Sequence, residues 1–203
     1  MTIEKGQPWG HSIAVPLTTR DVNSDWQLAQ GGKEDIHILL GGDLHSTLGH
    51  PTGIKPGDTR TLVHIDAMEC TITDHSSSYS LLASATVEIG RWVNPIRPSR
   101  YIVVTNGGLL DNRNIAPRAH PNDGVLDLMS IDASMPLRDR ILSTRRARTG
   151  AHLPHPNITI GRGESFTFVR QNERERLFID RLLMKSWTSV EIKVLADYWQ
   201  VIV

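Results

Sequence analysis

The sequence has a single cysteine, Cys70, and aromatic residues make up only 5% of its 203 residues. One cysteine excludes a disulfide within the chain and argues against a cluster of thiolate metal ligands. No apolar run approaches the roughly 18 residues of a membrane-spanning helix. The N-terminal "MTIEKGQPWGHS" lacks the apolar segment of a secretion signal. We therefore expect a cytoplasmic protein with no transmembrane segment.

An excess of either charge is also missing, because 22 lysines and arginines balance 22 aspartates and glutamates. A neutral balance gives no electrostatic support for binding nucleic acid or an anionic membrane surface. Apolar residues make up 39% of the chain and charged residues 22%, which is typical of a folded domain. The length fits one domain, or one domain with a small appendage.

Short strand patterns dominate the chain from about residue 60 onward. "GVLDLMSID" alternates strictly between apolar and polar residues, and "RYIVVTNGG" is an apolar run typical of a sheet interior. Many short strands with few helices predict a β-sandwich or a closed β-structure.

The strongest helix pattern is "PLRDRILSTRRART", residues 136–149. Its first residue is a proline and a glycine follows its last residue, as expected at the two ends of a helix. Leu137, Ile141 and Leu142 share one face, with arginines elsewhere, which predicts an amphipathic helix.

Two glycines precede an aspartate in "LLGGDLHSTLG". Gly41 and Gly42 allow backbone amides to approach a ligand, and Asp43 opens the next turn, so the segment is a candidate for contacting a phosphate or Mg²⁺. Alternatively, Asp43 caps a short helix and stabilises it by roughly 1 kcal/mol. The run is not a P-loop, because no GKS or GKT follows the glycines.

The stretch "APRAHPNDGVLDLMSID" (116–132) is both stiff and acidic. Pro117 and Pro121 restrict the backbone, and Gly124 permits a positive φ. Asp123 therefore lies at the start of a strand on a rigid support, where it could bind a metal. The alternative is a simple turn in which its side chain bonds the neighbouring backbone.

Two further segments carry charges that need an explanation. Arg145, Arg146 and Arg148 lie at the end of the predicted helix, where they favour the helix macrodipole; the alternative is a phosphate-binding patch. Asp180 lies within the apolar "LFIDRLLM", where a buried charge is costly unless it is paired. Asp180 is either at the tip of a hairpin in solvent or a general base in a partly dry cleft.

Taken in order, these segments resemble the C-terminal half of the diacylglycerol and sphingosine kinase superfamily of lipid kinases. "GGDLHSTLG" is similar to the family segment G-T-x-N-D-F-x-R-x-L-G, with Asp43 at the family's Asp. "APRAHPNDGVLDL" is similar to A-P-x-A-x-x-D-D-G-x-L-D-V, with Asp123 at the second Asp. The resemblance covers roughly residues 38–203. The chain also resembles short actinobacterial proteins labelled as diacylglycerol-kinase catalytic-domain proteins.

This resemblance implies a mainly β fold, an antiparallel β-sandwich with one or two helices, like the C-terminal domain of lipid kinases. Together with the residue patterns, it predicts a set of site residues: Asp180 as the catalytic base, Asp43 and Asp123 as Mg²⁺ ligands, and Gly41, Gly42, Arg146 and Arg148 as contacts to a cofactor or ligand phosphate.

The chain departs from the family pattern in two places. The G-G-D-G-T motif, which holds the ATP phosphates in the family, does not occur in the residues before Ile38. The family's D-G-E hairpin becomes Asp180, Arg181 and Leu182, and we expect Arg181 to pair with Asp180 and hold it ionised. ATP would therefore be used only if a partner completes the nucleotide site.

We divide the chain into an N-terminal extension (1–37), packed on the domain, and a lipid-kinase C-terminal-like β domain (38–203). Three functions stay open. The first is a degenerate or non-autonomous kinase-like protein that binds a phosphorylated or lipid-like small molecule. The second is an ATP-dependent lipid kinase, completed by a second copy of this chain or by a separate nucleotide-binding chain. The third is a non-catalytic interaction module.

Overall fold

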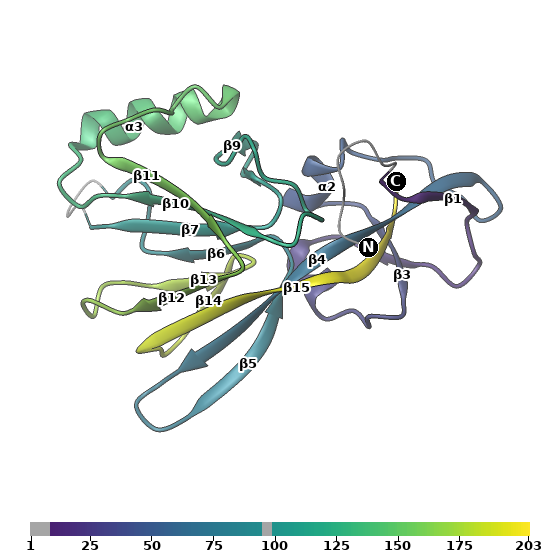
Figure 1. Ribbon diagram of the computed structural model, residues 1–203, viewed down its shortest axis with the longest axis horizontal. Coiled ribbons are helices and arrows are strands. Elements are labelled where there is room, and N and C mark those ends of the chain that lie inside the picture. The colour runs from purple at the N-terminus through teal and green to yellow at the C-terminus, as the bar shows by residue number, and fades with distance from the viewer. Residues whose placement is uncertain (1–8, 95–98) are drawn as a thin grey trace.

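The computed structural model describes residues 9–94 and 99–203, which form two large β-sheets and a small hairpin (Figure 1). In the first sheet the strand order is β1-β4-β15-β3-β2, with β5 paired to β4 and β12 paired to β15. Its strands are β1 (His11–Ala14), β2 (Arg20–Val22), β3 (Ile36–Leu39), β4 (Thr59–Thr73), β5 (Ser78–Ala83), β12 (Ser165–Val169) and β15 (Ser189–Ile202). Its pairings are antiparallel except that β3 runs parallel to β2 and to β15.

The second sheet is antiparallel throughout, in the order β11-β10-β7-β6-β13-β14. Its strands are β6 (Thr86–Ile89), β7 (Tyr101–Thr105), β10 (Leu126–Ile131), β11 (Ile158–Gly163), β13 (Leu177–Ile179) and β14 (Leu182–Met184). The small hairpin pairs β8 (Leu109–Leu110) with β9 (Arg113–Asn114).

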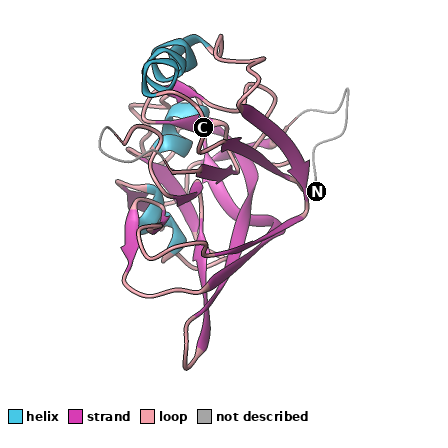
Figure 2. Cartoon of the chain, turned by 90° about the vertical axis from the view of Figure 1, so that its left-hand side faces the viewer, coloured by secondary structure: helices cyan, strands magenta, loops and turns pink. Residues whose placement is uncertain are grey.

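Helices contribute little of the described chain. They are α1 (Asp25–Ala29), α2 (Asp43–Thr47), α3 (Leu137–Arg146) and the short 3-10 helix η1 (Ala147–Thr149). Figure 2 shows the longest of them, α3, at the top edge of the molecule above the strands. No helix among the described residues is long and apolar enough to span a bilayer.

The main core lies between the two large sheets. Met68 and Ile192 from the first sheet pack in one cluster with Val104 and Leu177 from the second. A second cluster covers the other face of the second sheet, beneath α3, and includes Trp92. The predicted β-sandwich is therefore confirmed.

Several local predictions agree with the structure. The strictly alternating "GVLDLMSID" becomes β10, and Gly150 ends η1 with a φ of 72°. At the C-terminal end, residues 189–202 form one long strand, β15, whose register against β4 shifts between Leu195 and Trp199. Residues 9–37 contain β1 and β2, which are strands of the first sheet, and the short helix α1. Residues 1–8 lie outside the described residues, and the division at residue 38 stays a prediction.

The orientation of α3 is opposite to its sequence pattern. Arg140 and Ser143 are on the buried side of the helix, whereas Ile141 is 38% exposed. Leu137 and Leu142 are only half-buried. The predicted helix is present, but its buried side is that of Arg140, because the guanidinium finds carbonyl partners beneath the helix that no periodicity indicates.

Candidate functional site

The β13–β14 hairpin turns on Asp180 and Arg181, where the lipid-kinase pattern has Asp and Gly. Both residues have a positive φ, of 43° and 68°. Such a two-residue turn matches the twist of the flanking strands. An arginine in this left-handed region costs roughly 1 kcal/mol or more relative to glycine. Arg181 must therefore form contacts that offset this strain.

The carboxylate of Asp180 is buried, with 5% of the residue exposed. Its Oδ1 accepts the N–H groups of Ala85 and Thr86, both at 2.9 Å. Its Oδ2 accepts the N–H of Ser84 at 2.7 Å and lies 3.3 Å from the Ser84 hydroxyl. Asp180 thus ties the β13–β14 turn to the connection between β5 and β6.

Two opposing effects set the protonation of Asp180. Burial raises its pKa, and the hydrogen bonds from the backbone of residues 84–86 lower it because they stabilise the carboxylate. A general base must reach the proton that it removes, directly or through one water. Both oxygens of Asp180 already accept bonds from the protein's own amides. This geometry suits a structural carboxylate and not the catalytic base that the family resemblance implies.

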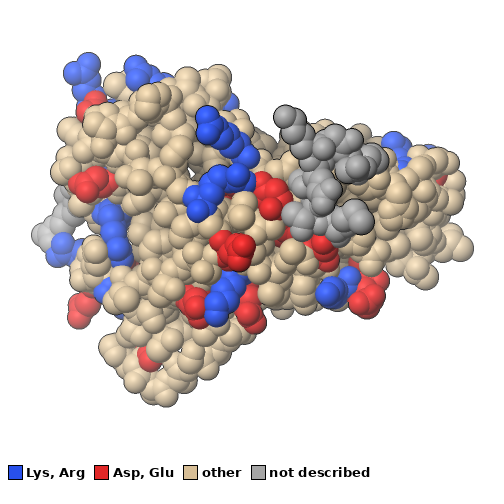
Figure 3. Space-filling view, viewed as in Figure 1, with Lys and Arg blue, Asp and Glu red and all other residues tan. Residues whose placement is uncertain are grey.

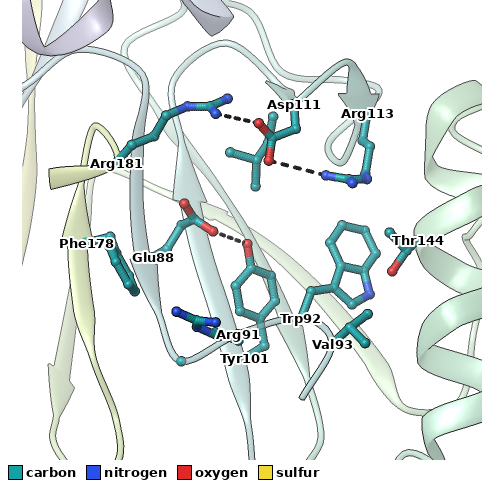
Figure 4. A pocket seen from close by; sticks show the side chains of 12 residues that line it. Glu88, Arg91, Trp92, Val93, Tyr101, Asp111, Arg113, Thr144, Phe178 and Arg181 are labelled. Atoms are coloured by element: carbon teal, nitrogen blue, oxygen red, sulfur yellow. Dashed lines mark hydrogen bonds and ion pairs between the residues drawn. The ribbon is translucent and has the colours of Figure 1, made fainter. Parts of the chain in front are cut away.

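Arg181 does not pair with Asp180. Its Nη2 binds the Asp43 carboxylate at 2.8 and 3.0 Å, and its Nη1 pairs with Asp111 (Figure 4). Partial burial lowers the pKa of Arg181, but the hydrogen bond to Asp43 and the negative charge of Asp43 outweigh this effect and raise the pKa. The expected pairing with Asp180 is wrong, because Asp180 faces the buried backbone while Arg181 reaches toward α2 and the β8–β9 hairpin.

Gly41 and Gly42 join β3 to α2, and the absence of their side chains permits close packing. A Cβ on Gly42 would lie 2.5 Å from Oδ1 of Asp25, and one on Gly41 would lie 2.6 Å from the carbonyl oxygen of Asn23. The N–H groups of the first two residues of α2 donate to the Asp25 carboxylate at 2.6 and 3.1 Å. The amides considered for a ligand phosphate are therefore already bonded to a side chain of this protein.

Asp25 belongs to the same buried network as Asp180. Burial raises the pKa of Asp25 to about 7, and the nearby charges of Asp180 and Asp43 add to the rise. Ser84 joins the two acids, because its hydroxyl donates to the Asp25 carbonyl at 2.9 Å and lies 3.3 Å from the Asp180 carboxylate. Protonation of this network is thus linked to the stability of the fold near neutral pH.

Asp123 precedes β10 in the proline-rich loop. Its carboxylate pairs with Arg162 of β11, and its Oδ1 accepts the N–H of Val125 at 3.3 Å. The buried Asp66, and not Asp123, accepts the N–H of Gly124, at 2.9 Å. Asp123 therefore forms both the turn contact that was the simpler expectation and an ion pair with the neighbouring strand.

The contacts of Asp43 and Asp123 bear on the predicted Mg²⁺ site. Within residues 9–94 and 99–203, no hydrogen bond or ion pair joins the two aspartates, and no group of three or more His, Cys, Asp or Glu side chains is placed to hold a metal ion. Mg²⁺ needs oxygen ligands in near-octahedral geometry, whereas Arg181 and Arg162 occupy these carboxylates. In this structure the two carboxylates bind guanidinium groups and not Mg²⁺. A Mg²⁺ site shared by Asp43 and Asp123 stays a prediction.

Arg146 and Arg148 lie at the end of α3 and in η1, and both are exposed. Neither lines the cavity that is bounded by Glu88, Trp92, Thr144 and Arg181, so a ligand in that cavity would not contact them. Their expected contact with a ligand phosphate stays a prediction.

A cavity of ≈ 370 Å³ opens where β6, β7 and β13 meet the β8–β9 hairpin and α3 (Figure 4). We call it the Glu88–Arg181 cavity. Its apolar wall includes Trp92, Tyr101 and Phe178, and the Trp92 and Tyr101 rings stack with centroids 5.9 Å apart. Its volume lies in the range of small-molecule sites.

Charged groups surround this apolar wall. Glu88 accepts the Tyr101 hydroxyl at 2.5 Å, and Arg113 lies 3.4 Å from the Asp111 carboxylate. Burial raises the pKa of Glu88, and the charge of Arg181 lowers it. Arg91 lies at the edge of the cavity and forms no ion pair or hydrogen bond with another of the described residues. The cavity can therefore offer aromatic contact, a carboxylate and several guanidinium groups to one ligand.

Sequence reasoning singled out Arg181 but missed Glu88, Arg91 and Arg113. Glu88 carries a weak signal, because it is a charged residue inside the apolar run "ATVEIG". The two arginines carry none, since an arginine in a loop or a short hairpin is most simply a solvated surface residue.

Comparisons with known proteins agree with this architecture. The family model for the YegS C-terminal NAD kinase beta sandwich-like domain matches residues 83–180. A crystal structure described as "a putative diacylglycerol kinase from Bacillus anthracis str. Sterne" is similar with a TM-score of 0.52 and 12% identity, covering 88% of this chain and 75% of that one. Yeast NADH kinase complexed with NADH is similar with a TM-score of 0.52 and 9% identity, covering 89% and 59%.

At these identities the structures show the fold alone, and no curated protein sequence matches the chain. The family model adds a sequence match across β6 to β13, which includes Glu88, Asp111, Arg113 and Asp180. Residues 83–180 therefore match the YegS C-terminal NAD kinase beta sandwich-like domain, and the predicted resemblance of this chain to the C-terminal half of the lipid kinases is confirmed.

Proposed function

We propose that this chain is a kinase-like binding domain that holds a phosphorylated or lipid-like small molecule in the Glu88–Arg181 cavity and does not transfer phosphate by itself. The observation that carries the second half of this proposal is the bonding of Asp180. A buried carboxylate whose two oxygens already accept three backbone N–H groups, with the Ser84 hydroxyl at 3.3 Å, is poorly placed to remove a proton from a substrate hydroxyl.

The ligand class follows from the cavity. Trp92, Tyr101 and Phe178 supply apolar contact, while Arg91 and Arg113 at the edge supply donors that suit phosphate oxygens. The similar structures are named for a lipid kinase and for a dinucleotide kinase, and this supports a ligand that combines apolar or aromatic surface with polar groups.

The first experiment measures turnover. The purified chain is incubated with radiolabelled ATP, Mg²⁺ and a panel of diacylglycerol, sphingosine and related acceptors. We expect no labelled lipid above the level of a protein-free blank. Turnover that Asp180→Asn abolishes, while circular dichroism shows a folded variant, would overturn the loss of catalysis and favour an ATP-dependent lipid kinase.

The second experiment measures binding by titration calorimetry with short-chain phosphatidic acid and, separately, the matching diacylglycerol. We expect phosphatidic acid to bind more tightly, and Arg113→Ala to weaken it about tenfold, because a hydrogen bond to a charged group contributes roughly 1.5–3 kcal/mol. The matched control is Arg20→Ala, an exposed arginine on β2. Absence of binding, or equal losses in both variants, would overturn the proposed ligand site.

A further inference from the structure

The inner side of α3 is held by a buried arginine. Arg140 is 0% exposed. Its Nε donates to the Met135 carbonyl at 3.1 Å, its Nη1 to the Trp92 carbonyl at 3.2 Å, and its Nη2 to the carbonyls of Ser99 and Asp132, both at 2.7 Å. The guanidinium thus fastens three loop segments beneath the helix.

The outer side of α3 carries the apolar residues of the helix together with arginines. Five side chains line a shallow depression on this side: Leu137, Arg138, Ile141, Leu142 and Arg145. Ile141 lies between the two arginines, one turn from each along the helix. We call these five residues the α3 outer face.

This arrangement is unfavourable for an isolated domain. Burying a guanidinium costs free energy even when carbonyls accept all its bonds. Leaving Ile141, Leu137 and Leu142 partly in water forgoes roughly 25 cal/mol for each Å² of apolar surface not buried. Stability of the helix alone therefore does not explain why its apolar residues face outward.

We propose that the α3 outer face docks on an anionic lipid bilayer. Arg138, Arg145, Arg146 and Arg148 are exposed on α3 and η1, and Asp139 is the single acid of these two elements. Figure 3 shows basic side chains along the edge where Figure 1 places α3. Arginines around exposed apolar residues are the composition of helices that lie in the interface of anionic membranes.

One further acid, Asp132, precedes the helix, and its carboxylate accepts the N–H of Ser134 at 2.7 Å. Asp132 and Asp139 together offset two of the four exposed arginines, so this end of the molecule keeps a local positive charge. The charge balance of the whole chain gave no reason to expect membrane binding, because the arginines of α3 and η1 are offset by acids elsewhere in the molecule. A bilayer responds to the local charge within about one Debye length, roughly 8 Å at physiological salt.

Docking through this face would also bring the Glu88–Arg181 cavity near the lipid. Thr144 of α3 lines that cavity, so the helix separates the cavity from the outer face by its own width. The docking proposal does not depend on the ligand proposal, since it concerns the opposite side of the helix.

The test is co-sedimentation of the full chain with vesicles of equal phosphatidylcholine and phosphatidylglycerol, and with vesicles of phosphatidylcholine alone. We expect binding to the anionic vesicles only. Arg138→Ala combined with Arg145→Ala should weaken it about 25-fold, from roughly fivefold for each arginine near the surface. Ile141→Ser should weaken it several-fold because it removes the inserted apolar group.

Matched controls are Arg20→Ala combined with Arg174→Ala, which removes the same charge from other exposed sites, and Val169→Ser, which removes an apolar side chain 64% exposed on β12. Both should bind like the wild type. Equal losses in the control pair, or no effect of Ile141→Ser, would show general adhesion to polyanions and overturn the proposal. Absence of binding by the folded wild type, or full competition by inorganic phosphate at constant ionic strength, would overturn it as well.

Discussion

Asp180 and Glu88 lie close together in the second sheet, yet their carboxylates have different surroundings. Asp180 accepts three backbone N–H groups, whereas Glu88 accepts one phenol and faces a cavity. Burial raises the pKa of both. A carboxylate with a raised pKa is therefore a candidate for function only if some of its hydrogen-bonding capacity is left for a ligand.

The largest effect that we expect from this comparison is on stability. Asp180→Asn places an amide donor against backbone donors in a buried site, so it should lower the free energy of unfolding by about 3 kcal/mol. Glu88→Gln keeps an acceptor for the Tyr101 hydroxyl and should change it by less than about 1 kcal/mol. Urea denaturation of the two variants measures the difference.

If both variants lost equal stability, Glu88 would be as structural as Asp180 and the comparison would fail. A stable Asp180→Asn protein would instead show that the amides of residues 84–86 find other partners, and would reopen Asp180 as a candidate base.

A smaller effect is the pH dependence of the free energy of unfolding, which we expect from Asp25, the acid whose carbonyl accepts the Ser84 hydroxyl. The pKa of Asp25 is raised to about 7 in the folded state from 3.8. Between these values the folded state binds more protons than the unfolded state, so the stability from this group decreases as pH rises toward 7 and is lost above it. We expect the wild type to gain about 1 kcal/mol, relative to Asp25→Asn, when pH is lowered from 8 to 6.

This pH effect is measured as the difference between the two proteins in unfolding free energy at each pH, so that other titrating groups cancel. A difference that stays constant from pH 8 to pH 6 would place the proton elsewhere in the buried network.

The smallest effect on stability concerns Arg181, which follows Asp180 in the hairpin turn and lines the same cavity as Glu88. Arg181→Gly relieves a positive φ but removes the partner of Asp43 and Asp111, and the two changes should cancel to within about 1 kcal/mol. Because Asp43 then has no guanidinium partner, we expect millimolar Mg²⁺ to raise the melting temperature of this variant and not of the wild type.

Arg181→Lys is the control, since it keeps a cation beside Asp43. Stabilisation of the wild type by Mg²⁺ would show that a metal already competes with Arg181, and would support the magnesium site predicted from the sequence.

Local sequence patterns were enough to predict the β-sandwich and its resemblance to the lipid kinases. Alternation in β10 and the apolar run in β7 are local patterns, and each predicts a strand without any knowledge of its neighbours. The segment "APRAHPNDGVLDL" carries its family signal in consecutive residues. Such features depend on a short stretch of chain, so they can be read before the fold is known.

The partners of the charged residues depend instead on contacts between distant parts of the chain. Asp180 is 94 residues from Thr86, and Arg181 is 138 residues from Asp43, so neither contact follows from local spacing. The buried side of α3 was decided in the same way, because Arg140 bonds carbonyls in loops as far away as Trp92. A carboxylate or guanidinium takes its role from whichever partners the fold brings within about 3 Å, and a sequence pattern does not contain that information.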